Sequence, residues 1–540
     1  MRWPALAGVL LALVLAGCGK PDEAAKPAPA PEAAAFSVLA GSELRDLEPA
    51  LLKAAAAAGV PLKLSYAGTL DIVERINAGE RFDAILPPNG AYPALALAAK
   101  PLAREKLFYS RVALGVKAAK ARALGWDKTP PTWAAIARAG ADGSLRYAMT
   151  NPASSNTGMS ALFAVAAAAA GKTEDLRAQE VDAALLTGFL KGQKLTAGSS
   201  GWLAEAFIKD PAALDAMVNY EAVILRSNAQ LGAADRLLMI YPQDGVISAD
   251  YPLMLLSEGQ REAYGKLVAA LKSPAFQRDT VAAAFLRPAV PEVALAAGLS
   301  AAAVAELSFP NSLDVIDTVL GAYQGEWRRP ATSIFVLDVS GSMQGERLEA
   351  MRTALKSLAG PSAGASAGAS AGASAGASAG AGTDTASGRY ARFQSRERVL
   401  LISFSDRVDA PVLVNFAANA MATARGEVIA YADALQVRGG TGIYAALLQA
   451  QALAAAERQR DPERFVSIVL LTDGENTAGP DLASFRTQLK AGVTARVFPI
   501  LFGEASNADM TALAEFTGGR VFDGRRAALG RVFKEIRGYQ

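Results

Sequence analysis

Asp338, Ser340 and Ser342 place one carboxylate and two hydroxyl groups at alternate positions of the chain. They directly follow an apolar run, residues 333–337, which predicts a buried strand, so these side chains fall at the strand's carboxyl end. Oxygen atoms spaced in this way can point at one spot. A hard divalent cation suits such a spot, because it prefers oxygen ligands and often keeps several waters. The alternative is a capped helix start without a metal.

Two later segments carry oxygen-bearing side chains that could join the same site. Residues 439–443 form a glycine-rich loop around Thr441, and Asp473 follows a second apolar run at residues 465–471. In this order, the three pieces resemble the metal-ion-dependent adhesion site (MIDAS) of von Willebrand factor A (VWFA) domains. The resemblance implies that one Mg²⁺ ion, or Mn²⁺ or Ca²⁺, is held by Asp338, Ser340, Ser342, Thr441 and Asp473. It also implies that the Asp or Glu carboxylate of a protein partner completes the shell.

The rest of this C-terminal part, residues 331–540, fits the same fold. Apolar runs at 398–404, 465–471 and 495–502 predict buried strands with helices between them, and 517–522 predicts a closing turn and edge strand. We expect a doubly wound, Rossmann-like α/β sheet with the metal site at its strand ends. A run of Ala-Ser-Ala-Gly repeats lies inside it, at about 361–388. The repeats lack large apolar residues, so we expect a disordered insert that costs little stability.

The amino terminus predicts export and lipid anchoring. Met1 and Arg2 are followed by an apolar run at residues 5–16, which is too short to span a bilayer, and the run ends in Leu15-Ala16-Gly17-Cys18. This ending resembles the lipobox of bacterial lipoproteins, which implies a signal peptide at 1–17 and a lipid on Cys18. An uncleaved signal anchor is the alternative. The Pro- and Ala-rich residues 18–35 predict a tether, and the residues after Cys18 favour the outer membrane if the source is Gram-negative.

Composition excludes many functions. The chain has no histidine and no cysteine besides Cys18, which removes Ser-His-Asp and Cys-His catalysis and imidazole-based zinc sites. The net charge is +2 without a strongly basic patch, which argues against nucleic-acid binding. We therefore expect no enzyme. A metal-dependent hydrolase is the less favoured alternative, since it lacks an obvious general base.

Residues 36–296 predict a separate α/β body. Strand-like runs at 36–40, 61–65 and 82–86 alternate with helical segments, which indicates βαβ units and a parallel sheet. The opening resembles type II periplasmic solute-binding proteins, which are bilobal. Residues 107–116 resemble their crossover strand between lobes, 151–158 resemble a turn that opens an apolar helix, and 241–245 and 250–252 resemble the late strands that return to the first lobe.

In that family, ligand contacts come from loops at helix amino termini, where free amide groups can hold an anion. The resemblance thus implies a small anionic solute and these candidate ligand residues: Ser42, Ser65, Thr69, Ser154, Ser155, Asn156 and Thr157. Simple helix capping would explain the same residue types. Residues 297–330 form a linker with a short helix expected at 315–323. Arg328 and Arg329 could pair with acids across a domain interface, but we prefer two solvated charges.

These observations predict an exported, lipid-anchored binding protein in the cell envelope, facing the periplasm or the cell surface. Its VWFA domain would bind a protein partner through the metal. Its solute-binding-like domain would bind a small solute or a partner. The main alternative is a substrate-binding lipoprotein that delivers a small anion to a transport system.

Overall fold

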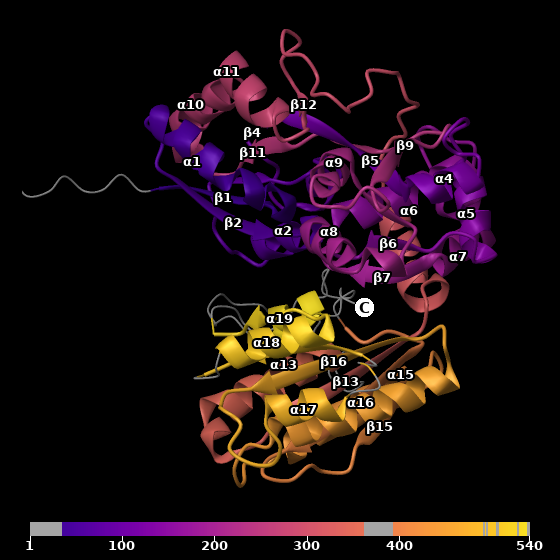
Figure 1. Ribbon diagram of the computed structural model, residues 1–540. Coiled ribbons are helices and arrows are strands. Elements are labelled where there is room, and N and C mark those ends of the chain that lie inside the picture. Colours follow the sequence, from indigo (N-terminus) through magenta and orange to yellow (C-terminus); the bar gives the residue numbers. More distant parts are fainter. Residues whose placement is uncertain are drawn as a thin grey trace, which may run out of the picture.

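The computed structural model describes residues 35–360, 392–489, 492, 495–503, 507–525 and 529–536. The expected signal peptide, the tether up to residue 34 and the Ala/Ser/Gly insert therefore lie outside the described residues. Figure 1 shows a bilobal N-terminal domain above a C-terminal α/β domain. Both are mixed α/β structures, which confirms the expected fold class.

The first lobe contains a mixed sheet with the strand order β2-β1-β3-β11-β4, in which β1 pairs in parallel with β2 and β3. Its strands are β1 (Phe36–Gly41), β2 (Leu62–Ala67), β3 (Ala84–Leu86), β4 (Ala103–Lys106) and β11 (Pro252–Leu255). Its helices are η1 (Ser42–Leu47), α1 (Glu48–Ala57), α2 (Thr69–Asn77), α3 (Ala91–Ala96), α10 (Arg261–Leu271) and α11 (Pro274–Phe276). The predicted strand–helix alternation is confirmed here.

The second lobe is built around β5, the crossover strand, in the order β10-β5-β8-β6-β7, and β9 and β12 also pair with β5. Its strands are β5 (Phe108–Lys117), β6 (Tyr147–Thr150), β7 (Gln193–Ala197), β8 (Ala216–Tyr220), β9 (Leu237–Ile240), β10 (Ser248–Ala249) and β12 (Arg287–Pro288). Its helices are α4 (Ala118–Ala123), α5 (Trp133–Ala141), α6 (Asn156–Ala169), α7 (Ala183–Lys191), α8 (Ser200–Lys209) and α9 (Glu221–Asn228).

One predicted strand of this region is wrong. Residues 241–245 form a turn, in which the Gly245 amide donates to the carbonyl of Pro242, instead of a strand that returns to the first lobe. The apolar residues that pair lie just before it, in β9, and the returning strand is β11. The helix expected at 315–323 is confirmed as α12 (Leu313–Ala322).

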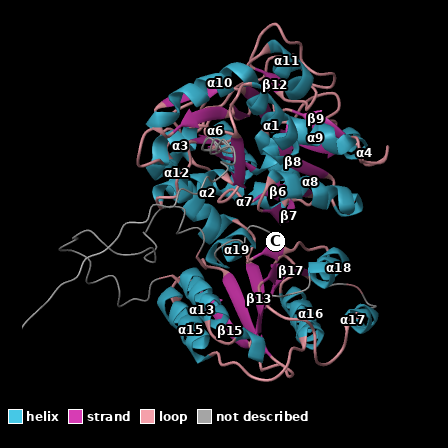
Figure 2. Ribbon diagram, turned by 90° about the vertical axis from the view of Figure 1, so that its left-hand side faces the viewer, coloured by secondary structure: helices cyan, strands magenta, loops and turns pink. Residues whose placement is uncertain are grey.

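The C-terminal sheet has the order β15-β14-β13-β16-β17-β18, parallel except for the edge strand β15. Its strands are β13 (Ala331–Asp338), β14 (Glu397–Phe404), β15 (Val412–Phe416), β16 (Phe465–Thr472), β17 (Arg496–Leu501) and β18 (Phe522–Asp523). Its helices are α13 (Glu346–Ala359), α15 (Met421–Ala434), α16 (Ile443–Arg460), α17 (Leu482–Gln488), α18 (Asn507–Thr517) and α19 (Leu529–Ile536). Figure 2 shows helices on both faces of this sheet.

Strand β13 is buried along its whole length, as a central parallel strand must be. Phe335 and Leu337 belong to the core with α13 and α19, while Ile334 and Val336 belong to the core on the other face with α16. This alternation fixes the register of the strand and therefore the position of its last residue, Asp338.

The junction between the domains is held by charged residues at the amino ends of the C-terminal strands. Arg328 is buried and forms an ion pair with the buried Glu397. Arg329 donates to the carbonyl of Gln193 at 3.3 Å and lies 3.4 Å from Glu463. The preference for two solvated arginines was therefore wrong. Both acidic partners belong to the C-terminal domain, and of these contacts only the Arg329 bond to Gln193 crosses to the second lobe.

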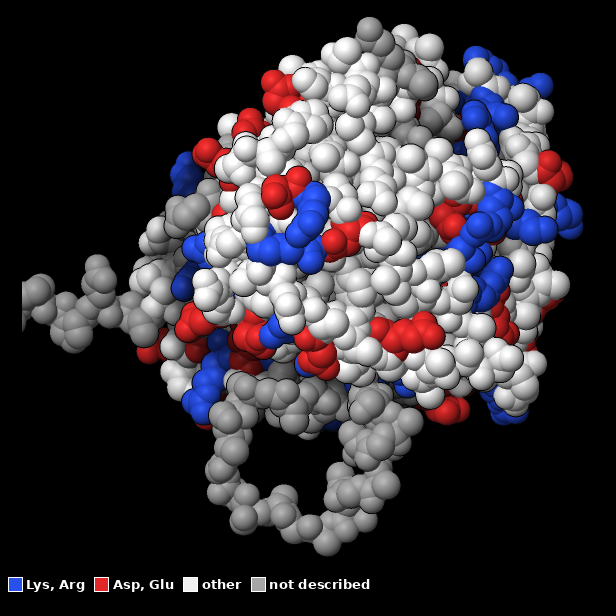
Figure 3. Space-filling model, turned by 90° about the horizontal axis from the view of Figure 1, so that it is seen from below, with Lys and Arg blue, Asp and Glu red and all other residues white. Residues whose placement is uncertain are grey.

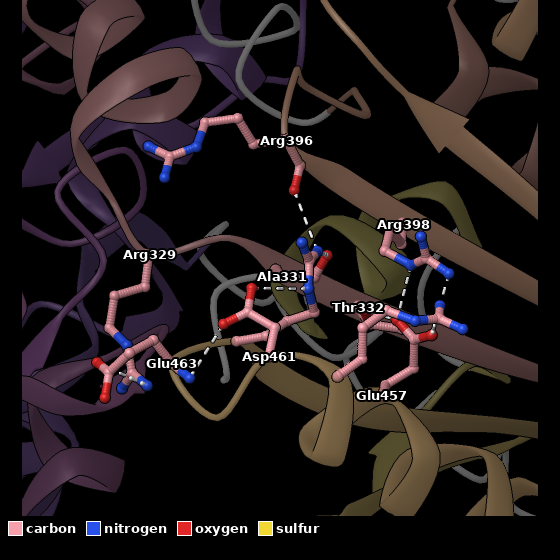
Figure 4. A network of polar contacts seen from close by, with 10 residues as sticks. Arg329, Ala331, Thr332, Arg396, Arg398, Glu457, Asp461 and Glu463 are labelled. Carbon is pink, nitrogen blue, oxygen red and sulfur yellow. Dashed lines mark hydrogen bonds and ion pairs between the residues drawn. The ribbon is translucent and has the colours of Figure 1, made fainter.

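Figure 4 shows how this region is tied together. Glu457 accepts hydrogen bonds from Arg398 at 2.7 and 3.0 Å and from Thr332 at 2.9 Å, which joins α16 to β13 and β14. Lys194 of the second lobe adds a pair with Glu463 at 3.1 Å. The second lobe and the C-terminal domain are thereby joined at the amino ends of the strands.

Candidate metal site and solute cleft

The predicted metal ligands come from neighbouring strand ends. Strands β13 and β16 pair in parallel and end at Asp338 and Thr472, so Asp473 begins the loop beside the one that carries Ser340 and Ser342. Thr441 lies in the loop that leads into α16. The sheet therefore brings all three sequence segments to one edge, as the order of the motifs predicted.

A chain of hydrogen bonds connects these side chains. Asp338 accepts from the Ser340 amide at 2.8 Å and from the Thr472 hydroxyl at 2.6 Å. The Ser340 and Ser342 hydroxyls lie 3.0 Å apart, and Ser342 donates to Asp473 at 2.7 Å. Burial raises the pKa of the Asp338 carboxyl above its usual value, although the hydrogen bonds from Ser340 and Thr472 oppose this.

Thr441 faces the same point from the other side. A Cβ atom placed on Gly474 would lie 3.6 Å from the hydroxyl oxygens of both Ser342 and Thr441, so both hydroxyls border this glycine. The loop is held in place by Thr477, whose hydroxyl accepts from the Thr441 amide at 2.8 Å. Asn476 accepts from the Ile443 amide at 2.8 Å, which fixes the start of α16.

This donor set fits a small hard cation. Ligand oxygens about 2.1 Å from an octahedral Mg²⁺ lie about 3 Å from one another, close to the observed spacing of Ser340, Ser342 and Asp473. All candidate ligands are oxygens, which favours Mg²⁺ or Mn²⁺ over zinc. Within the described ranges, no group of three or more His, Cys, Asp and Glu side chains could hold a metal, as expected for a site with only two carboxylates.

Sequence reasoning missed residues that support this site. Arg347, in the first turn of α13, contacts the second oxygen of Asp473 at 2.5 Å and adds a positive charge beside it. Thr472 holds the Asp338 carboxylate. The position of Thr472 directly before Asp473 could have indicated its role. Arg347 gave no such signal, since its contact depends on how α13 packs.

The loop that carries Ser340 and Ser342, here called the metal loop, lies at the end of the sheet far from the domain junction. The strands start at the second lobe and run away from it, and Ser342 is exposed at their far end. Figure 3 views the molecule from below, over the C-terminal domain, and shows acidic and basic residues interspersed among uncharged ones.

A second candidate site lies between the lobes of the N-terminal domain. A cavity of about 660 Å³ is lined by Ser42 of the first lobe and by Ser154 and Trp202 of the second. Val532 and Glu535 of α19 also line it, so the C-terminal domain borders the cavity. The lobes touch beside it, because a Cβ atom on Gly68 would lie only 2.2 Å from the carbonyl oxygen of Ser154.

The cavity contains only part of the predicted ligand set. Ser42 and Ser154 line it, while these others do not: Ser65, Thr69, Ser155, Asn156 and Thr157. The hydroxyls of Thr150 and Thr157 lie 2.8 Å apart, and Asn156 donates to the Tyr220 hydroxyl at 3.0 Å. These side chains therefore secure the loop before α6 in this conformation, and their contact with a solute stays a prediction.

Glu43 is the cavity residue that sequence reasoning passed over. It follows the predicted Ser42 in the first turn of η1, and it is 9% exposed. Burial, as the largest effect, raises the pKa of the Glu43 carboxyl from 4.5 to about 7. An acid in a first helical turn is common, so the sequence pattern gave no reason to expect a buried carboxyl in the cleft.

Comparison with known families agrees with both halves of this architecture. Residues 36–283 match the family of bacterial extracellular solute-binding proteins, and residues 333–475 match the von Willebrand factor type A domain. The chain thus combines a solute-binding-protein-like domain with a VWFA domain. The first match indicates an extracellular or periplasmic location. No described helix has both the length and the apolar character needed to cross a membrane.

Solved structures resemble the two parts separately. A ferric binding protein from Campylobacter jejuni has 14% identity and a TM-score of 0.42, and the alignment covers 53% of this chain and 96% of that protein. The periplasmic binding protein AfuA from Actinobacillus pleuropneumoniae has 12% identity and a TM-score of 0.41, with coverage of 54% and 97%. A von Willebrand factor type A protein from Catenulispora acidiphila has 19% identity and a TM-score of 0.28, with coverage of 39% and 42%. No curated protein sequence matches this chain significantly.

Proposed function

We propose that this protein is an exported, lipid-anchored binding protein with two separate binding sites. The VWFA domain holds a protein partner through a divalent ion, Mg²⁺ or Mn²⁺, and the N-terminal domain holds a small solute between its lobes. The lipid anchor rests on Cys18, which lies outside the described residues. The observation that supports the proposal is the meeting of Asp338, Ser342, Thr441 and Asp473 at one end of the sheet, where Ser342 is exposed and the other three are buried.

The set of ligand atoms favours a divalent ion with open coordination positions, which an external ligand can fill, over an ion that is fully coordinated by the protein. Asp338 and Asp473 offset the charge of a divalent ion, and Arg347 adds one positive charge, so the loaded site carries a net charge of about +1. Ser340, Ser342 and Thr441 are neutral hydroxyls. An ion held in this way keeps water positions and attracts a carboxylate, so an Asp or Glu of a protein partner suits it.

Calorimetry of the purified protein with Mg²⁺ tests the site. We expect Asp338→Ala and Asp473→Ala to lose Mg²⁺ binding, because each removes one of only two carboxylates. Asp433→Ala is the matched control, since this exposed residue of α15 pairs with Lys356 outside the site. Mg²⁺ affinity like that of the unmodified protein in both site variants would refute the metal site.

Affinity capture of envelope proteins tests the partner. We expect a protein to be retained in the presence of Mg²⁺, to be released by EDTA, and to be absent with Asp338→Ala. The Asp433→Ala protein should retain it. A partner that binds equally with EDTA and with Asp338→Ala would show that recognition takes place elsewhere on the molecule.

A further inference from the structure

The cavity between the lobes is lined by a buried carboxylate with one oxygen unpaired in the described part of the chain. One oxygen of Glu43 forms no hydrogen bond among the described residues, and Glu43 lines the cavity. The Tyr251 hydroxyl lies near the same carboxyl group, and the Gly41 backbone packs against it so closely that a Cβ atom there would lie 2.5 Å from Oε1. The protein thus holds the carboxylate in place and leaves one buried oxygen without a donor from the described residues.

Within the described ranges, the second lobe contains another buried acceptor without a donor, in Asn156. Tyr220 lies close to Glu43, and Asn156 donates its amide group to the Tyr220 hydroxyl at 3.0 Å. The Asn156 carbonyl oxygen is then left buried without a donor among the described residues. A buried polar atom without a partner costs about 1–3 kcal/mol, so a donor that reached either acceptor would be stabilising.

Glu221 is a buried carboxylate of the same domain that has a full set of hydrogen-bond donors, and it can be compared with Glu43. Glu221 is fully buried, and it accepts from Arg287 at 2.6 and 2.8 Å, from the Tyr241 hydroxyl at 2.6 Å and from the Arg111 amide at 3.0 Å. Glu43 has no such set of donors. Arg226 is the cation that acts on Glu43, but its guanidinium donates to the carbonyl of Ala284 at 2.9 Å.

The helix starts around the cleft do not favour an anion. Glu43, Asp71 and Glu221 occupy the first turns of η1, α2 and α9, where each offsets the positive end of its own helix. At α6, the Gly158 amide already donates to the Thr150 hydroxyl at 2.8 Å. An anionic solute at these helix starts would therefore meet carboxylates, while the basic residues of the cavity wall lie elsewhere in its lining: Arg45, Arg75, Lys209, Arg226 and Arg520.

We propose that the solute of the N-terminal domain is a small organic cation with N–H groups, such as a primary ammonium compound, and that Glu43 accepts its hydrogen bond. The inference rests on the proposed solute-binding function and names the ligand class. An N–H group of the solute supplies the donor that Glu43 lacks, and its charge offsets that of the carboxylate.

The test is calorimetry and thermal shift of the full protein with named probes. The cations are methylammonium, 1,4-diaminobutane and agmatine, tetramethylammonium is the cation without N–H groups, and the anions are sulfate and phosphate. We expect an N–H cation to bind and to raise Tm, and tetramethylammonium and both anions to have no effect. Glu43→Gln should weaken the binding at least about tenfold, the loss typical of one charged hydrogen bond.

Two further variants separate a binding role from a structural one. Glu262→Gln changes an exposed acid on α10 and should bind like the unmodified protein. Gly68→Ala leaves Glu43 unchanged but places a methyl group against Ser154, so it should hinder closure of the lobes and weaken the same ligand. This second variant keeps the proposal testable if Glu43→Gln does not fold.

The possible results separate a failure of the cation proposal from a failure of the proposed solute-binding function. Binding of sulfate or phosphate, or binding of an ammonium compound that Glu43→Gln does not weaken, would overturn the cation proposal and leave the solute-binding function standing. Failure of every probe to bind would count against both.

Discussion

Replacing Glu43 with Gln should stabilise the N-terminal domain in a pH-dependent manner. The side chain is 9% exposed, and its pKa is raised from 4.5 to about 7, chiefly because burial disfavours the charged form. Glutamine has nearly the same shape and carries no charge at any pH. The substitution therefore removes the cost of a buried charge and leaves the surrounding packing in place.

The direction of the effect follows from proton linkage. A carboxyl whose pKa is higher in the folded than in the unfolded protein favours the folded state only while it is protonated. The unmodified protein should lose stability as the pH rises from about 4.5 to about 7, and Glu43→Gln should not. The difference between these two pKa values corresponds to about 3 kcal/mol at pH 8, and the gain should vanish near pH 4.

Thermal unfolding of both proteins between pH 4 and pH 8, without added ligand, measures this gain. About 3 kcal/mol corresponds to roughly 6 to 12 °C in the Tm of a domain of this size. Tyr220, Tyr251 and Arg226 also face the carboxyl, and they are the same in both proteins. If the gain in stability of Glu43→Gln does not depend on pH, or if the variant is less stable at pH 8, then Glu43 does not carry a destabilising buried charge.

Three other substitutions test separate parts of the molecule. Arg328→Met should lower the free energy of unfolding by about 3–5 kcal/mol in urea titrations, because it leaves Glu397 buried without its partner, and the added change Glu397→Leu should recover most of the loss. Gly519→Ala should lower the Tm of the C-terminal domain, since its Cβ would lie 1.8 Å from the carbonyl oxygen of Val497, and a Tm equal to that of the unmodified protein would contradict this contact. Cys18→Ser should move the protein from the membrane to the soluble fraction on ultracentrifugation, and retention in the membrane would exclude the lipid anchor.

The elements that position the metal loop could be predicted because their signals are local. The apolar run of β13 and the polar residues after it determine where the strand stops, and parallel pairing then places Asp338 beside the start of the Asp473 loop. The short edge strand β15 was not predicted. Val412 and Leu413 are exposed in it, so it lacks the continuous buried run that marked the central strands.

The parts that sequence did not predict depend on contacts between distant segments. Glu43 reads as an ordinary acid in a first helical turn until the lobes meet, and only then is it buried. In the sequence, Arg328 resembles an ordinary charged linker residue, and its ion pair with Glu397 forms only when β14 packs beside the linker. Both contacts arise from packing that no local pattern encodes.

The orientation of the C-terminal sheet has a consequence for how the two sites would be used together. An eight-residue strand such as β13 is about 26 Å long, and the junction with the second lobe lies at one end while the metal loop lies at the other. A protein bound at the loop would lie at the end of the sheet that is far from the second lobe. One molecule would therefore act as a bridge that carries a solute and a protein at the same time, and the bound protein would meet the solute at a raised local concentration.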